Sequence, residues 1–135
     1  MTVTETDLAR RAAEYFRDLG WVLYYEVALR GLSGRPDIVG TRGALMLICE
    51  VKTSLGLAVI EQAAAHLGEA HYVYVATPWT GRIGHATTRW LQSLGVGYLR
   101  VGTSVEAHCE EGVAPTFMRR AATGWVSRLK PEHQT

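Results

Sequence analysis

The sequence contains little that would support a disulfide scaffold, a zinc site made of cysteines or a membrane span. Its two cysteines, Cys49 and Cys109, are too few for either cysteine framework. Its apolar stretches fall well short of the roughly 18 residues that cross a bilayer, and the N-terminal residues MTVTETDLARR lack the apolar core of a signal peptide. We therefore expect a reduced, cytoplasmic protein without a membrane segment.

An excess of one charge is also missing. Fourteen Lys and Arg residues stand against thirteen Asp and Glu residues, which gives a net charge of +1. This balance neither indicates nor excludes a nucleic-acid partner, because a basic face can be hidden in a neutral sum. Gly31-Leu32-Ser33-Gly34 matches no phosphate-binding glycine fingerprint, and nothing resembles a helix-turn-helix or a zinc finger, so we expect no base-sequence specificity.

What is present is the composition of one globular domain over residues 1–135, with 47% apolar and 20% charged residues. Apolar spacings of three and four predict helices over residues 4–19, 56–68 and 83–94 and a helical stretch over 116–129. Strands are expected over residues 21–29, 36–40, 44–52, 72–77 and 96–101, and an acidic loop over 106–111. This αβββαβαβ order predicts an α/β fold with a mixed sheet and helices on both faces.

The third expected strand, Leu45 to Lys52, is apolar on both faces except at its end. Alternation places Glu50 and Lys52 on one face there, although burying charges costs several kcal/mol and pairing often only offsets that cost. Asp37 stands thirteen positions before Glu50, at the start of the neighbouring strand. In a hairpin the two carboxylates would be adjacent and would repel each other without a cation between them. Two oxygen ligands of this kind suit Mg²⁺.

Pro36-Asp37 followed by Glu50-Val51-Lys52, within an αβββαβ order, resembles the PD-(D/E)XK nuclease superfamily. Within it the chain is most similar to small Holliday-junction-resolvase-like and restriction-endonuclease-like domains. The resemblance spans residues 4–101 and leaves 102–135 as a C-terminal extension. It implies a restriction-endonuclease-like fold and a magnesium-dependent deoxyribonuclease, expected to be an endonuclease, in which Mn²⁺ could replace Mg²⁺.

The resemblance also implies roles for single residues. Asp37 and Glu50 would bind the metal together with the main-chain carbonyl of Val51, and Lys52 would position or help to deprotonate the attacking water or stabilise developing negative charge. Members of the superfamily often take a further acid from the first helix, for which Glu5 is the best match. Glu26, near the end of the first strand, is the rival, and the choice between them stays open.

Gln62, ten residues after Lys52 on the next helix, matches a glutamine that contacts the active site in several of these families. Some of them add a tyrosine four positions later, where this sequence has His66. We interpret His66 and His71 as a helix-surface and a strand-start histidine rather than as metal ligands. Thr53 and Ser54 are expected to cap the following helix.

The expected DNA contacts are arginines. Arg30, Arg35 and Arg42 flank Asp37 in loops and would form a positive rim for backbone phosphates. Arg119 and Arg120 on the expected C-terminal helix would give a second contact. A domain with one active centre would need a partner to cut both strands symmetrically, so we expect a homodimer, with Trp79 and Trp125 as candidate interface aromatics.

Two other functions remain open from the sequence. The domain could be a catalytically silent nuclease fold that binds nucleic acid or a protein. It could also be a small α/β ligand-binding module in which Asp37, Glu50 and Lys52 are structural charges.

Overall fold

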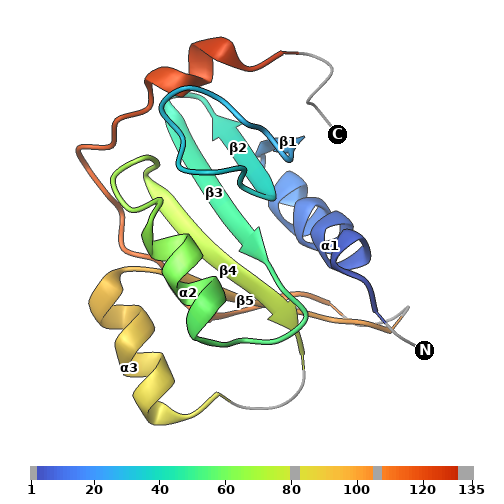
Figure 1. Ribbon diagram of the computed structural model, residues 1–135. Helices are drawn as coiled ribbons and strands as arrows, with labels where there is room; N and C mark the ends of the chain where they lie inside the picture. The colour runs from blue at the N-terminus through green and yellow to red at the C-terminus, as the bar shows by residue number, and fades with distance from the viewer. Residues whose placement is uncertain (1–2, 80–82, 105–107, 131–135) are drawn as a thin grey trace.

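Six strands form one mixed sheet with helices on both faces in the computed structural model, which describes residues 3–79, 83–104 and 108–130 (Figure 1). In order across the sheet the strands are β1 (Val22–Tyr25), β2 (Ile38–Arg42), β3 (Leu45–Val51), β4 (Tyr72–Pro78), β5 (Gly97–Val101) and β6 (Glu110–Val113). β1, β2 and β3 pair antiparallel, β3, β4 and β5 pair parallel, and β6 returns antiparallel to β5. The α/β class and the mixed sheet expected from the sequence are confirmed.

The first helix, α1 (Glu5–Asp18), covers one face of the sheet (Figure 1). The Thr4 hydroxyl accepts a hydrogen bond from the Asp7 N–H at 3.1 Å and donates one to the Asp7 carboxylate, and these bonds cap the start of the helix. Leu8, Ala12 and Phe16 are buried against the sheet. Leu19, the last residue of the helix expected over 4–19, lies after the end of α1 and is half exposed.

Two further helices cover the opposite face (Figure 1). α2 (Leu57–Ala64) is shorter than the helix expected over residues 56–68 and buries Val59, Ile60 and Ala63, whereas Leu57 is exposed. α3 (His85–Leu94) ends at Gly95, whose φ of 86° is a left-handed conformation that favours glycine.

The predicted hairpin between β2 and β3 is present. Arg42 pairs with Leu45 across the short turn at Gly43, and Ile38 pairs with Cys49 at the other end. Both strands are buried on both faces, which requires apolar residues throughout, apart from the polar ends. β1 stops at Tyr25, earlier than predicted, because Glu26 adopts a positive φ of 48° that breaks the extended backbone.

The C-terminal residues differ from the prediction in two ways. Part of the expected acidic loop is β6, while Glu106 lies outside the described residues. The expected helix over 116–129 is a 3₁₀ turn, η1 (Gly124–Arg128), after an irregular segment. The N–H groups of Thr116, Met118 and Ala122 donate to carbonyls of Gly95, His71 and Gly68 in the main body, so these groups do not form helical bonds within the segment.

Trp125 on η1 anchors this segment. Its side chain is 1% exposed, and its indole N–H donates to the Glu69 carbonyl at 2.7 Å. The C-terminal segment is therefore packed on the core, and the exposure on which we based a dimer contact at Trp125 is absent. Trp79 is exposed, with the Arg100 guanidinium over its ring. Within the described residues, no helix is both long and apolar enough to span a membrane.

We predict that Trp125→Ala lowers the free energy of unfolding by about 3–5 kcal/mol, because it leaves a cavity and an unpaired Glu69 carbonyl. Trp90→Ala, at a half-exposed position on α3, is the matched control and should cost less than about 1.5 kcal/mol. Urea unfolding measures both. Equal costs at the two positions would show that the C-terminal segment does not contribute to the core.

Candidate active site

The end of β3 is the point where charged residues enter an otherwise apolar sheet. Ile38 pairs with Cys49, so the same register places Asp37 opposite Glu50. By alternation Glu50 belongs to the face of β3 that carries Ile48, whereas Asp37 lies just before β2 begins and borders residues of α1 in a surface hollow. Glu50 is 6% exposed, whereas Asp37 is partly exposed at the mouth of the site.

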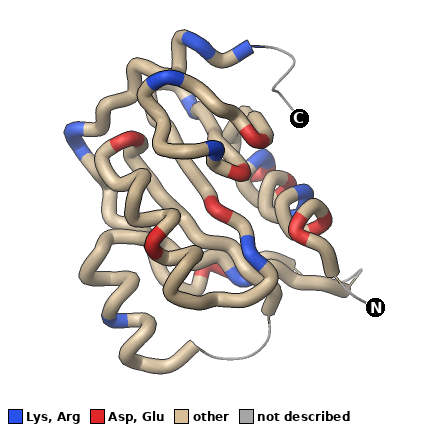
Figure 2. Tube along the Cα trace, in the orientation of Figure 1, with Lys and Arg blue, Asp and Glu red and all other residues tan. Residues whose placement is uncertain are grey.

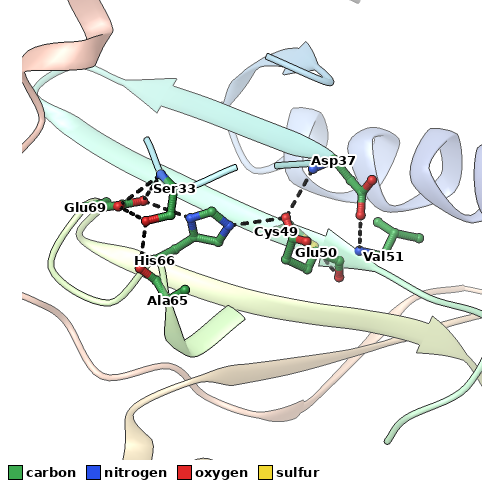
Figure 3. A network of polar contacts seen from close by, with 8 residues as sticks. All are labelled: Ser33, Asp37, Cys49, Glu50, Val51, Ala65, His66 and Glu69. Atoms are coloured by element: carbon green, nitrogen blue, oxygen red, sulfur yellow. Dashed lines mark hydrogen bonds and ion pairs between the residues drawn. The ribbon is translucent and has the colours of Figure 1, made fainter. Parts of the chain in front are cut away.

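Two hydrogen bonds tie Asp37 to β3 in opposite directions (Figure 3). The Asp37 N–H donates to Glu50 Oε1 at 3.3 Å. The Val51 N–H donates to Asp37 Oδ2 at 2.7 Å. The carboxylate of Asp37 is thus fixed next to the backbone of Val51, and that of Glu50 is fixed next to the backbone of Asp37.

The local environment disfavours the charged form of Asp37. Burial raises its pKa most, the neighbouring Glu50 and Glu5 raise it further, and the Val51 hydrogen bond and Lys52 lower it, with a net pKa of about 6. A cation placed beside this carboxyl group would favour its charged form, the carboxylate.

Lys52 and Glu5 meet at the solvent side of this cluster. The Lys52 Nζ lies 3.7 Å from Glu5 Oε2, and both side chains are nearly half exposed. Such a surface pair adds less than about 1 kcal/mol to stability. It does bring the first-helix acid and the lysine of the strand to the site, so Glu5 lies where the sequence argument placed it.

Glu26, the rival third acid, shares a hollow with Glu5 and Asp37. The hollow has a volume of about 330 Å³ and is lined by Glu5, Thr6, Ala9, Arg10, Tyr25, Glu26 and Asp37. The Glu26 N–H donates to the Asp37 carbonyl, and its own carbonyl accepts from Arg35 Nε at 2.9 Å. Glu5 and Glu26 therefore both border the site, and the Lys52 contact distinguishes Glu5.

His66 was assigned to the helix surface, and this is wrong. The imidazole is 3% exposed, with Nε2 3.4 Å from Glu50 Oε1 and Nδ1 2.9 Å from Glu69 Oε1 (Figure 3). Burial by itself lowers the pKa of His66, but hydrogen bonds to Glu50 and Glu69 outweigh it, so the pKa is raised. Glu69 in turn accepts hydrogen bonds from the Ser33 N–H and hydroxyl. Burial raises the pKa of Glu69, but its hydrogen bonds outweigh burial, so the pKa is lowered.

The sequence contains a signal for this network that we did not use. His66 follows Val59 by seven residues and Ala63 by three, which places it on the buried face of α2 continued by one turn. Glu69 follows His66 by three residues. A histidine on a buried face needs polar partners, and the acid at this spacing provides one.

Other predicted residues are less close to the acids. Gln62 is exposed on α2. Arg42 lies at the far end of β2, about 16 Å along the strand from Asp37, where it donates to the Leu19 carbonyl and covers the Trp21 ring. The predicted arginine rim therefore does not include Arg42.

The predicted second DNA contact also changes. Arg119 and Arg120 are exposed, but the helix expected to carry them is not formed. They follow Met118, whose N–H donates to the carbonyl of His71 beside the start of β4, away from the end of β3. Figure 2 shows basic positions along the loop between β1 and β2 and along the C-terminal segment, with acidic positions where that loop meets β2.

The donor set at the end of β3 suits a hard divalent cation that keeps much of its water. The described residues contain no group of three or more His, Cys, Asp or Glu side chains arranged to hold a metal ion. Asp37, Glu50 and the carbonyl of Val51 are oxygen donors, and Mg²⁺ is usually bound by one or two carboxylates, water and substrate phosphate. The raised pKa of Asp37 beside two other acids is the observation that fits a cation here.

A second hollow, of about 340 Å³, lies elsewhere, lined by residues that include Tyr15, Trp21, Arg42, Tyr72 and Glu111. It combines aromatic rings with one acid and one base. Since it lacks the paired carboxylates found at the end of β3, we do not assign it hydrolytic chemistry.

Comparison with known proteins adds information on the fold alone. No family model matches the chain, and no curated protein matches it. A solved structure of a protein of unknown function from Silicibacter pomeroyi is similar, with a TM-score of 0.61 and 20% sequence identity, over 90% of this chain and 79% of that chain. The α/β architecture described above therefore occurs in another protein. This similarity does not indicate a function for the present chain.

We predict that Asp37→Asn stabilises the metal-free protein at pH 7 and loses this advantage in acid. The folded-state pKa of about 6 lies above the unfolded value of about 3.9, so the folded state binds more protons, and stability falls as pH rises between these values. Above pH 6 the carboxylate is a cost that Asn removes, about 1 kcal/mol after solvent screening. Thermal unfolding from pH 3.5 to 8 measures it, with exposed Glu61→Gln as control. A gain that is independent of pH would contradict this origin.

Proposed function

We propose that the protein is a metal-dependent nuclease of the PD-(D/E)XK type that hydrolyses phosphodiester bonds of DNA, with Mg²⁺ as cofactor. The observation that carries the proposal is the placement of Asp37 opposite Glu50 at the end of β3, with Lys52 two residues further on and Glu5 beside it. A purely structural role would not need three acids and one lysine at one strand end.

The order of elements supports the same proposal. A helix precedes an antiparallel β1–β2–β3 meander, and α2 leads into β4, which is parallel to β3. This is the αβββαβ order of a restriction-endonuclease-like core. The acids lie where β2 begins and β3 ends, the polar ends of an otherwise apolar hairpin.

Each residue has a chemical task in this proposal. Asp37, Glu50 and the Val51 carbonyl would hold Mg²⁺, which when bound supplies positive charge for the phosphoryl oxygens and acidifies an attacking water. Lys52 would orient that water or stabilise negative charge that develops on the phosphate. Glu5 holds the Lys52 ammonium toward the cluster through its ion pair.

The loop between β1 and β2 is the proposed phosphate-binding element. Arg35 is two residues from Asp37 and is exposed, and Arg30 is exposed between Leu29 and Leu32, which pack against the core cluster that contains Trp125. The loop therefore extends from the acids toward the C-terminal segment, which carries Arg128. Contacts to backbone phosphates would fix the DNA without reading its sequence.

A nuclease fold that binds nucleic acid without cutting is the second candidate, and one observation favours it. Glu50 Oε1 is engaged by both the Asp37 N–H and His66 in the absence of a third metal-binding side chain among the described residues. If Glu50 keeps these two contacts when DNA binds, its carboxylate would serve a structural network and would not bind a metal for cleavage.

We predict Mg²⁺- or Mn²⁺-dependent cleavage of DNA that is abolished by EDTA. Asp37→Asn and Glu50→Gln should each lower the rate at least about 100-fold, because each removes charge that holds the cation, and a loss of about 2.7 kcal/mol has this size. Lys52→Ala should lower kcat while leaving the apparent affinity for Mn²⁺ within about threefold. Supercoiled, linear, single-stranded and branched DNA are the substrates.

Glu61→Gln, an exposed carboxylate on α2, is the matched control and should cut like the wild type. Metal-independent DNA binding without cleavage would select the second candidate. Cleavage that survives both Asp37→Asn and Glu50→Gln would show that the nuclease activity, if present, uses a different site.

We also predict that Arg30→Ala combined with Arg35→Ala weakens DNA binding and makes it less sensitive to salt. Removing two phosphate contacts should lower the slope of log affinity against log salt by about 2. Fluorescence anisotropy at several salt concentrations, with Ca²⁺ in place of Mg²⁺, measures this. Arg89→Ala, an exposed arginine on α3, is the control, and an equal effect there would mean that binding is not localised to the loop.

A further inference from the structure

Glu50 is the one buried acid of the candidate site, and its orientation depends on two donors. Its side chain is largely enclosed, and its contacts with the Asp37 N–H at 3.3 Å and His66 Nε2 at 3.4 Å both use Oε1. A carboxylate held at one oxygen presents its other oxygen, Oε2, in a fixed direction. Without the imidazole, a long Glu side chain has several rotamers of similar energy.

His66 is itself held from its other side. Its Nδ1 lies 2.9 Å from Glu69 Oε1, and Glu69 also accepts two hydrogen bonds from Ser33, one from the N–H and one from the hydroxyl at 2.5 Å. The Ser33 hydroxyl also lies within 3.4 Å of the Ala65 carbonyl. The imidazole therefore has one orientation, set by the same acid that fixes the loop between β1 and β2 (Figure 3).

We propose that His66 is a positioning residue that orients the Glu50 carboxylate for the cation and couples it, through Glu69 and Ser33, to the loop that carries Arg30 and Arg35. This proposal rests on the proposed function. In this proposal His66 contacts neither DNA nor the reacting atoms, and it acts through Glu50.

The arrangement accounts for features that a merely structural histidine would not need. The imidazole lies between two carboxylates rather than one. Its two nitrogens contact one acid at the end of β3 and one acid in the turn before β4, where Trp125 also donates to the Glu69 backbone. Groups that orient a metal-binding side chain in this manner typically change metal affinity or activity by about 10- to 100-fold when they are removed.

The test compares His66→Ala and His66→Gln with the wild type. We expect His66→Ala to weaken Mn²⁺ binding, followed by electron paramagnetic resonance without DNA, by about 10- to 100-fold and to lower kcat by a similar factor. The Gln side chain can still donate an amide N–H to Glu50, so His66→Gln should recover both values to within about fivefold of the wild type. DNA affinity in Ca²⁺ should stay within about threefold.

A spectroscopic measurement tests the contact without any activity. In protein labelled with ¹⁵N-histidine, the His66 nitrogen signals should shift in Glu50→Gln, while those of His85, exposed on α3, should not. Unshifted His66 signals would overturn the inference. His85→Ala is the matched control for the kinetics.

The outcomes separate the two proposals. The role of His66 alone would be overturned if the wild type cuts DNA and both His66→Gln and a folded His66→Ala bind Mn²⁺ and cut DNA within twofold of the wild type. A wild type that neither binds Mn²⁺ nor cuts DNA would overturn the proposed function, and the role of His66 with it. If His66→Ala does not melt cooperatively, His66→Gln decides: the proposal requires that it binds Mn²⁺ better than Glu50→Gln, and equal weakness would contradict it.

Discussion

The hydrogen bond from the Val51 N–H to the Asp37 carboxylate connects the start of β2 to the end of β3 at the point where the pairing of the hairpin ends. It places the Asp37 backbone N–H against Glu50, which is in turn held by His66. The positions of the Asp37, Glu50 and His66 side chains thus depend on how the start of β2 meets the end of β3. Because the register of an antiparallel pair shifts whole faces when it slips by one residue, the apolar residues of the hairpin also determine the geometry of the acids.

The electrostatics of this strand end are incomplete without a positive charge. Three acids, Asp37, Glu50 and Glu5, are balanced nearby by Lys52, which is exposed, and by the imidazole of His66 on the far side of Glu50. Burial raises the pKa of Asp37 most, and the neighbouring charges of Glu50 and Glu5 raise it further. If the proposed cation binds here, its charge would offset the repulsion among these acids.

The sequence was informative where periodicity and turn residues act locally. The β2–β3 hairpin and a mixed sheet covered by helices on both faces followed from alternation and from the order of the elements. It was misleading for residues 116–129, where apolar spacing suggested a helix but the backbone N–H groups bond to distant carbonyls. Asp37, Glu50 and Lys52 were found because they form a motif at strand ends, whereas the contact between Ser33 and Glu69, 36 residues apart, was not found because no motif or local pattern encodes it.

The packing of Leu29 and Leu32 against the core cluster that contains Trp125 has a consequence for the order in which this protein can reach its final form. The hairpin and its acids are encoded before residue 52, and the helix and turn that bring His66 and Glu69 follow soon after. The loop beside them gains its buried packing partner only when the chain near residue 125 has been synthesised, and contacts of such long sequence separation form late. During synthesis, the hydrogen bonds from Ser33 to Glu69 would hold the loop first, and the packing of Trp125 would complete its anchoring last.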